Sequence, residues 1–91
     1  MVYAIVQLNL ESYDKWKPVF DERSALRKES GSKGARLFRN LENRNDVVIL
    51  FKWDNMENAR KYLESENLRE NLKEIGVTYT IKYFDELEKT F

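Results

Sequence analysis

The first residues of the chain alternate between apolar and other side chains. Residues 3–10 divide into two faces, one made of Ala4, Val6, Leu8 and Leu10 and the other of Tyr3, Ile5, Gln7 and Asn9. A period of two over this length is typical of a β-strand. The same period returns over residues 77–84, where Val77, Tyr79, Ile81 and Tyr83 alternate with Thr78, Thr80, Lys82 and Phe84. The pattern therefore predicts a strand near each end of the chain.

A helical period of three to four residues follows the first strand. The stripe that repeats at this spacing consists of Trp16, Val19, Phe20, Arg23 and Leu26. Ser12 precedes it and is suited to an N-cap, and the Ser-Gly-rich residues 30–34 are suited to end the helix. Pro18 has no N–H, so it must either lie in the first turn or bend the helix. We therefore expect the helix to start between Ser12 and Trp16.

Two further strands are predicted in the middle of the chain, at residues 35–40 and 46–53, joined as a hairpin by the polar residues 41–45. The second of these strands is apolar on both faces. One face carries Val47, Ile49, Phe51 and Trp53, and the other carries Val48, Leu50 and Lys52. A sheet covered by helices on one side only would leave the second face in water. We therefore expect something to cover Val48 and Leu50.

A second helical region is predicted between the last two strands. Asp54, three residues before Glu57, is similar to a capping box and predicts the start. The apolar positions of this region are Met56, Ala59, Tyr62, Leu63, Leu68, Leu72 and Ile75, with an expected break at Ser65 and an end at Gly76. The element order is then β-α-β-β-α-β. This order predicts an α+β, ferredoxin-like fold, a four-stranded antiparallel sheet with both helices on one face.

The amino-acid composition excludes many kinds of functional site. The chain has 91 residues, which predicts a single domain over residues 1–91. It contains no cysteine and no histidine, so disulfides, thiol nucleophiles, zinc fingers, imidazole bases and haem-ligating histidines are excluded. The glutamates of the second helical region alternate with lysine and arginine, a pattern typical of a solvated helix face, so we expect neither a metal site nor a cofactor.

The charge balance argues against nucleic acid as a partner. Sixteen basic and sixteen acidic residues cancel to a net charge of zero, whereas nucleic-acid binders carry a basic surface. Ferredoxin-like RNA-binding domains also need a glycine–aromatic run in the third strand, and residues 46–53 contain no glycine. No apolar run approaches the roughly 20 residues of a membrane span, and no export signal is visible, so we expect a cytoplasmic protein without a membrane partner.

Aromatic side chains from four predicted elements are candidates for a ligand pocket between helices and sheet. They are Trp16 and Phe20 of the first helix, Trp53 of the third strand, Tyr62 of the second helical region and Tyr83 of the last strand. The same residues could instead form the core, an interpretation favoured for Phe20. The tryptophan N–H and tyrosine O–H groups need hydrogen-bond partners when buried, which leaves both interpretations open for the other four.

Arg23 is the unusual residue of the first helix. It lies on the apolar stripe between Phe20 and Leu26, so its guanidinium must reach water, a carboxylate or a ligand anion. Arg27 lies one turn further on and Arg36 lies in the next strand. Together the three arginines could form a cluster that faces an anion.

Several runs of the sequence match a known family pattern. They are YDKWKPVFDE at 13–22, LR at 26–27, Gly31, GARLFR at 34–39, VVILFKW at 47–53 and NAR at 58–60. With these runs the chain resembles the antibiotic biosynthesis monooxygenase-like family, also described as cyclases, in the dimeric α+β barrel superfamily. The resemblance implies a homodimer whose two sheets pack face to face. Such a dimer would cover Val48 and Leu50.

The resemblance also implies an activity. The oxygenases of this family hold a phenol or quinol with asparagine, tryptophan, tyrosine and arginine side chains, and the substrate's own carbanion reacts with oxygen without a cofactor. By this analogy Trp16 and Trp53 would wall the pocket beside Phe20, Tyr62 or Tyr83 would bind the substrate oxygen, and Arg23 would stabilise the enolate.

One residue departs from the family pattern. Close relatives tend to carry a histidine at the position of Arg23, and an arginine cannot act as a base near neutral pH. The expected function is therefore binding of a small aromatic or anionic molecule, with cofactor-independent oxygenase or cyclase activity towards an aromatic or quinol substrate. The alternative is a non-catalytic homodimeric binding or stress-response module, because no general base is evident.

Overall fold

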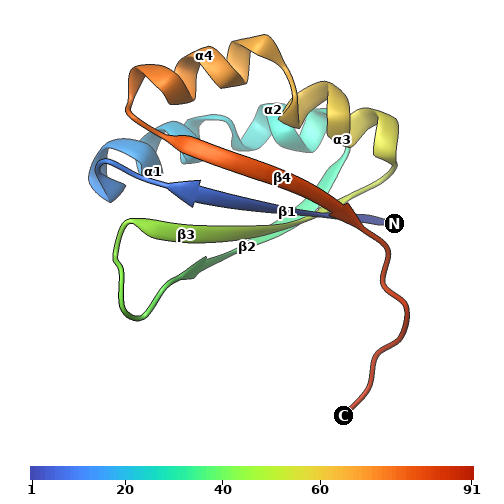
Figure 1. Ribbon diagram of the computed structural model, residues 1–91. Helices are drawn as coiled ribbons and strands as arrows, with labels where there is room; N and C mark the ends of the chain where they lie inside the picture. The colour runs from blue at the N-terminus through green and yellow to red at the C-terminus, as the bar shows by residue number, and fades with distance from the viewer.

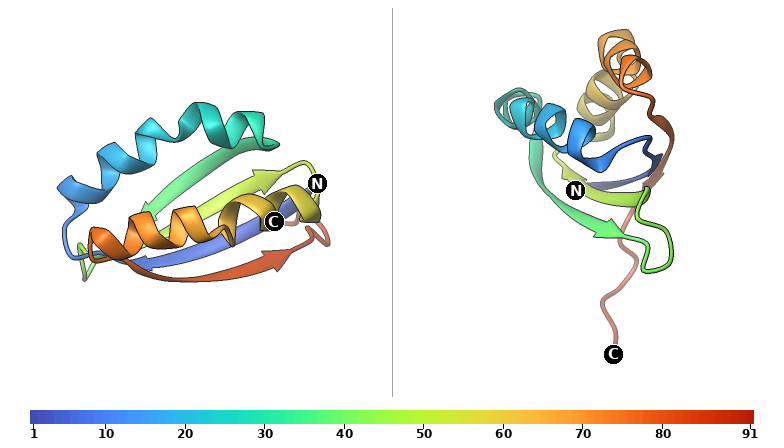
Figure 2. Two further views of the ribbon diagram at one scale, coloured as in Figure 1. Left: turned by 90° about the horizontal axis from the view of Figure 1, so that it is seen from above. Right: turned by 90° about the vertical axis from the view of Figure 1, so that its left-hand side faces the viewer.

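The computed structural model describes residues 1–91 and has the predicted β-α-β-β-α-β order, with each helical region split in two (Figure 1). Its elements are β1 (Val2–Asn9), α1 (Tyr13–Glu22), α2 (Ser24–Glu29), β2 (Ser32–Arg39), β3 (Asp46–Trp53), α3 (Met56–Leu63), α4 (Glu66–Glu74) and β4 (Thr78–Phe84). The strands form one antiparallel sheet in the order β2-β3-β1-β4. Both helical pairs cover the same face of this sheet (Figure 2). The predicted ferredoxin-like fold is therefore confirmed.

The helix-covered face of the sheet carries the core. On the two central strands, Ala4 lies opposite Phe51, Val6 opposite Ile49 and Leu8 opposite Val47, and all six are buried. Paired residues of an antiparallel sheet point to the same side, so the alternation of β1 and β3 places these side chains under the helices. Val48 and Leu50 point to the opposite face and are only half-buried. The two-sided apolar character of β3 therefore has no explanation within one chain.

The first helical region starts where the sequence predicts but does not continue as one helix. The Ser12 hydroxyl accepts the Lys15 N–H at 3.4 Å, as an N-cap does. Pro18 lies inside α1, beyond its first turn, and the helix breaks five residues later at Arg23. The expectation that Leu26 continues the buried stripe is wrong: Leu26 is 46% exposed, and Arg27 is buried instead. Arg27 follows Trp16 by eleven residues, about three full turns, so helical spacing itself places it on the Trp16 stripe and leaves Leu26 at the edge.

The second helical region begins one residue later than predicted. The N-cap of α3 is Asn55, whose side chain accepts the Asn58 N–H at 2.8 Å, whereas the Asp54 carboxylate accepts the Asn55 N–H at 2.7 Å. The break at Ser65 is confirmed, because its hydroxyl caps α4 at Leu68 N.

Gly76 follows the end of α4 with φ +71°, a left-handed conformation in which a side chain would also collide with Glu11. The second strand starts at Ser32, earlier than residue 35, with a bulge between Ser32 and Gly34. None of the helices is long and apolar enough to cross a membrane.

Candidate functional site

A small apolar cavity lies between the helices and the sheet. Its volume is about 40 Å³, and thirteen of its fifteen lining residues are hydrophobic. The hydrophobic lining residues are Val6, Leu8, Trp16, Val19, Phe20, Ile49, Phe51, Tyr62, Leu63, Leu68, Leu72, Tyr79 and Ile81. A space of this size holds about one or two water molecules and no aromatic ring. Any organic ligand must therefore displace side chains to enter it.

Arg23 connects the two helical pairs beside this cavity. Its Nε donates to the Tyr62 hydroxyl at 2.9 Å, and its Nη1 and Nη2 lie 3.3 and 3.4 Å from Asn67 Oδ1. Arg23 is the junction of α1 and α2, whereas Tyr62 belongs to α3 and Asn67 precedes Leu68 in α4. We call these three residues the Arg23 clasp. No carboxylate lies within ion-pair distance of Arg23, so its charge is not neutralised by the protein.

The Tyr62 hydroxyl has a free proton to donate. It accepts the bond from Arg23 and makes no second hydrogen bond, which leaves its proton without a protein acceptor. The ring is buried and lies over the cavity. A hydroxyl that accepts from a guanidinium is a stronger donor, because hydrogen bonds in a chain polarise one another. Arg23 and Tyr62 together could therefore hold a developing negative charge on a ligand oxygen.

A continuous row of aromatic rings crosses the molecule from the first helix to the second helical region. The successive ring centroids, from Tyr13 through Trp16, Phe20, Phe51 and Trp53 to Tyr62, are 5.7, 5.2, 6.4, 5.6 and 5.5 Å apart. These distances are in the range that favours aromatic pairs. The row explains how residues from three elements, α1, β3 and α3, form one wall of the core.

Trp53 belongs to this row but does not line the cavity. It is fully buried, and its indole N–H donates to the Ser30 carbonyl at 3.1 Å. This bond fixes Ser30, the residue that follows α2, against β3. The polar group of Trp53 is therefore used by the protein itself.

Tyr83 also lies outside the cavity. Its hydroxyl donates to Glu64 Oε2 at 2.7 Å, and the Arg60 guanidinium lies 5.5 Å from its ring centre. Partial burial, followed by the hydrogen bond and the negative charge of Glu64, raises the pKa of Tyr83. Of the six residues proposed from the sequence, the structure thus brings Trp16, Phe20, Arg23 and Tyr62 to the cavity and places Trp53 and Tyr83 elsewhere.

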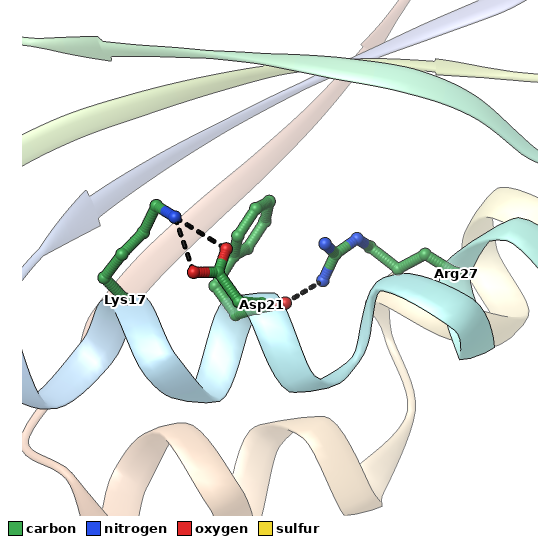
Figure 3. A network of polar contacts seen from close by, with 4 residues as sticks. Lys17, Asp21 and Arg27 are labelled. Carbon is green, nitrogen blue, oxygen red and sulfur yellow. Dashed lines mark hydrogen bonds and ion pairs between the residues drawn. The ribbon is translucent and has the colours of Figure 1, made fainter.

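Arg27 also lines the cavity, although the sequence placed it in a possible anion-facing cluster and not among the pocket residues. It is 8% exposed, its Nη1 donates to the Phe20 carbonyl at 2.6 Å, and its guanidinium carbon lies 3.7 Å from the centre of the Phe20 ring (Figure 3). Arg36 pairs with Leu50, which places it on the opposite face of the sheet. The three arginines therefore do not form one cluster, contrary to the expectation. Arg27 follows Trp16, Phe20 and Arg23 at the spacing of one helix face, which places it on the side of the sheet.

The cavity lining contains no aspartate or glutamate, so it holds no general base. No group of three or more acidic side chains in the molecule is arranged to hold a metal ion. The arginines and tyrosines of the lining face the cavity almost entirely with apolar atoms. The cavity itself therefore favours an apolar ligand surface, and a polar ligand group must reach the donors of Arg23 and Tyr62 beside it.

The fold resembles that of several solved proteins. SnoaB, a cofactor-independent oxygenase from Streptomyces nogalater, is 15% identical with a TM-score of 0.78, over 97% of this chain and 94% of that one. A Deinococcus radiodurans protein named for antibiotic biosynthesis monooxygenases is 17% identical with a TM-score of 0.67, over 100% and 97% of the two chains. A dimeric ferredoxin-like protein from an uncultured marine organism is 8% identical with a TM-score of 0.66, over 100% and 99%.

The sequence itself also assigns the chain to a family. No curated protein matches it closely enough to transfer a specific activity. The sequence profile of the family described as antibiotic biosynthesis monooxygenase matches residues 1–73, which contain β1 to β3, α3 and most of α4. This match covers most of the chain and includes the Arg23 clasp. The chain therefore belongs to the antibiotic biosynthesis monooxygenase family.

Proposed function

We propose that this chain binds a small aromatic, enolisable molecule in the cavity under the helices and oxidises it with oxygen without a cofactor. The observation that carries the proposal is the Arg23 clasp, an un-neutralised guanidinium joined to a buried tyrosine hydroxyl beside an otherwise apolar cavity. Apolar walls with few polar groups are typical of ligand sites. The solved relative SnoaB is named a cofactor-independent oxygenase, which supports this choice of reaction.

The chemistry follows from the donors that the site offers. An anthrone-like substrate loses a proton from its activated CH₂ group, and the electron pair moves onto the ring oxygen as an enolate. Tyr62, polarised by Arg23, donates to that oxygen and stabilises the charge. The carbanion carbon then transfers its electrons to oxygen and forms a peroxide, which loses water. The balance is CH₂ plus O₂ giving C=O plus H₂O, so oxygen is the only oxidant needed.

The proton of the substrate has to leave without a protein carboxylate. No acidic side chain lines the cavity, and arginine stays charged at every accessible pH. The site therefore acts by lowering the pKa of the substrate itself, and water that enters with the ligand accepts the proton. Only substrates that are already acidic, such as phenols and anthrones, suit this mechanism.

Ligand binding requires the cavity to expand. A volume of about 40 Å³ is smaller than any aromatic substrate. The contacts of Arg23 with Tyr62 and Asn67 join the two helical pairs across this region, so they must open to admit a ligand. The same donors are then free to bind the ligand oxygen. The clasp is thus both the closed state of the site and its source of hydrogen bonds.

The proposed functional unit is a homodimer with the two sheets packed face to face. The uncovered face carries the half-buried Val48 and Leu50, and Phe38, which pairs with Val48, is 51% exposed. At the other edge Phe84 pairs with Tyr3 and is 46% exposed. An apolar surface that spans all four strands is typical of an interaction surface. A similar fold is known as a dimeric ferredoxin-like protein.

A non-catalytic binding or stress-response module is the second candidate. The observation that favours it is the lack of a general base in the cavity together with the small volume. Such a module would bind an aromatic acid through the same donors and would release it unchanged. The two candidates differ in whether the bound molecule consumes oxygen.

An oxygen electrode and ligand titration together distinguish these functions. The full chain is mixed with 1,8-dihydroxyanthrone, with and without a chelator, and oxygen uptake and quinone absorbance are followed. We expect uptake above the buffer rate, insensitive to chelator and reduced in Tyr62→Phe and Arg23→Met. Tyr83→Phe is the matched control, because it removes a hydroxyl outside the cavity. Binding of the anthrone without faster oxygen uptake would favour the binding module, and neither binding nor uptake would refute both.

A further inference from the structure

A second concave region lies on the other side of Phe20, between the first helical region and the edge strand β2. Its volume is about 650 Å³, and it is an open groove rather than an enclosed cavity. Three of its ten lining residues, Arg27, Lys28 and Lys33, are cations, and Asp21 is the single acidic one. Phe20 and Arg27 line both the groove and the cavity, so they form the wall between the two spaces.

Arg27 is the most unusual residue of this groove. It is the only charged residue of the chain that is buried, and no carboxylate lies within ion-pair distance of it. One of its five N–H groups donates to the Phe20 carbonyl, and the face of the guanidinium covers the Phe20 ring. Its Nε and Nη2 make no hydrogen bond within the protein. No buried side-chain nitrogen of the protein lacks a partner, so these two groups reach solvent, where they can bind water or an anion.

The nearest acidic side chain of the groove is held away from Arg27. Both oxygens of Asp21 accept from Lys17 Nζ, at 2.6 and 2.7 Å, in an i, i+4 pair on α1 (Figure 3). Asp21 is thus neutralised by its own helix. The remaining charges of the groove, on Arg27, Lys28 and Lys33, are all positive. The groove therefore has a net positive charge in a protein whose total charge is zero.

Hydroxyl groups add further donors at the same place. Ser24 and Ser32 both line the groove, and Ser32 Oγ accepts the Gly34 N–H at 3.3 Å, which leaves its own proton free to donate. Gly34 has no heavy atom near the position of a side chain, so the groove is open at β2. Guanidinium and hydroxyl donors around an open space are the chemistry that recognises carboxylate and phosphate groups.

We propose that this groove is an oxyanion site in which Arg27 binds the carboxylate or phosphate group of a small ligand. The free Nε and Nη2 of Arg27 form the two-donor edge that matches two oxygens of such a group. Ser24, Ser32 and the ammonium groups of Lys28 and Lys33 complete the shell. The site does not depend on the proposed oxidation, because it uses Arg27 and not the Arg23 clasp.

The test is a nuclear magnetic resonance titration of the full ¹⁵N-labelled chain. Sodium phosphate and sodium benzoate are added in separate arms, each compared with sodium chloride at the same ionic strength. We expect saturable shifts of the Arg27 Nε–H signal and of the Ser24, Ser32 and Lys33 amides. Saturation by phosphate alone identifies a phosphate site, by benzoate alone a carboxylate site, and by both a general oxyanion site. Any of these supports the proposal.

Variants separate the site from general attraction to a basic surface. Arg27→Met should lower the affinity for the anion by at least about tenfold. A loss of this size corresponds to the lower end of the range for a charge-assisted hydrogen bond. Lys15→Met removes one charge from an exposed position of α1 outside the groove and should bind like the wild type. If the Arg27→Met variant does not fold, Arg27→Lys is tested instead. Lysine keeps the charge but lacks the two-donor edge, so anion binding should still weaken. Shifts that do not saturate at Arg27, or equal affinity in the Arg27 and Lys15 variants, would overturn the proposal.

Discussion

The Arg23 clasp gives a prediction that measures how the two helical pairs are held together. Arg23→Met keeps most of the apolar stem and removes the bonds to Tyr62 and Asn67. The bond to Tyr62 is the important one, at 2.9 Å and partly buried, whereas the contacts with Asn67 are longer and exposed. No carboxylate is left unpaired by the change, which limits the loss.

The size of the effect follows from these contacts. A charge-assisted hydrogen bond contributes about 1.5–3 kcal/mol when buried, and partial exposure reduces this. Removal of a cation that has no anionic partner offsets part of the loss. We expect the free energy of unfolding to fall by about 1 kcal/mol, which lowers the melting temperature by about 4–8 °C in a domain of this size.

The assay is urea unfolding of the four proteins of a double-mutant cycle: wild type, Arg23→Met, Tyr62→Phe and the double variant. We expect a coupling energy of about 0.5–1.5 kcal/mol between the two sites. Arg69→Met is the matched control, because Arg69 is exposed on α4 and its side chain makes no hydrogen bond or ion pair. Additive effects within about 0.3 kcal/mol, or a loss no larger than that of the control, would show that Arg23 does not hold the helices together.

Three further changes test other parts of the structure. Leu50→Lys places a charge in the apolar face of the sheet and should convert a dimer into a monomer at micromolar concentration; an unchanged mass in sedimentation equilibrium would locate the interface elsewhere. The pKa of Tyr83 is raised in the folded protein, so the unfolded chain loses this proton first, and stability should fall as the pH rises above the ordinary tyrosine pKa of 10.0. The urea midpoint of Tyr83→Phe should fall less steeply with pH than that of the wild type, and equal slopes would contradict this. Asn55→Ala removes the cap of α3 and should cost about 1 kcal/mol in thermal unfolding, whereas Glu70→Ala, on the exposed side of α4, should stay within about 0.5 kcal/mol.

The sequence alone determined the elements and the faces of the sheet. Successive side chains of a strand point to opposite sides whatever surrounds them, so the alternation in residues 3–10 and 46–53 was enough to sort the side chains of each strand into two faces. Ser12 was predicted as a helix start for a similar reason, because an N-cap binds a backbone N–H within its own first turn, and the break predicted at Ser65 proved to be an N-cap of the same kind. These are local properties, and the chain encodes them locally.

The site was decided by contacts between residues far apart in the chain. Helical spacing allowed both Leu26, at the edge of the stripe, and Arg27, near its centre, to be buried, and packing against the sheet buried Arg27 and left Leu26 46% exposed. Whether an aromatic residue lines a cavity or fills the core depends on how helices and strands pack. The Trp53 indole donates to the Ser30 carbonyl and the Tyr83 hydroxyl donates to Glu64, across 23 and 19 residues of the chain. Arg23 met Tyr62 across 39 residues, and only the tertiary structure could bring these two side chains together.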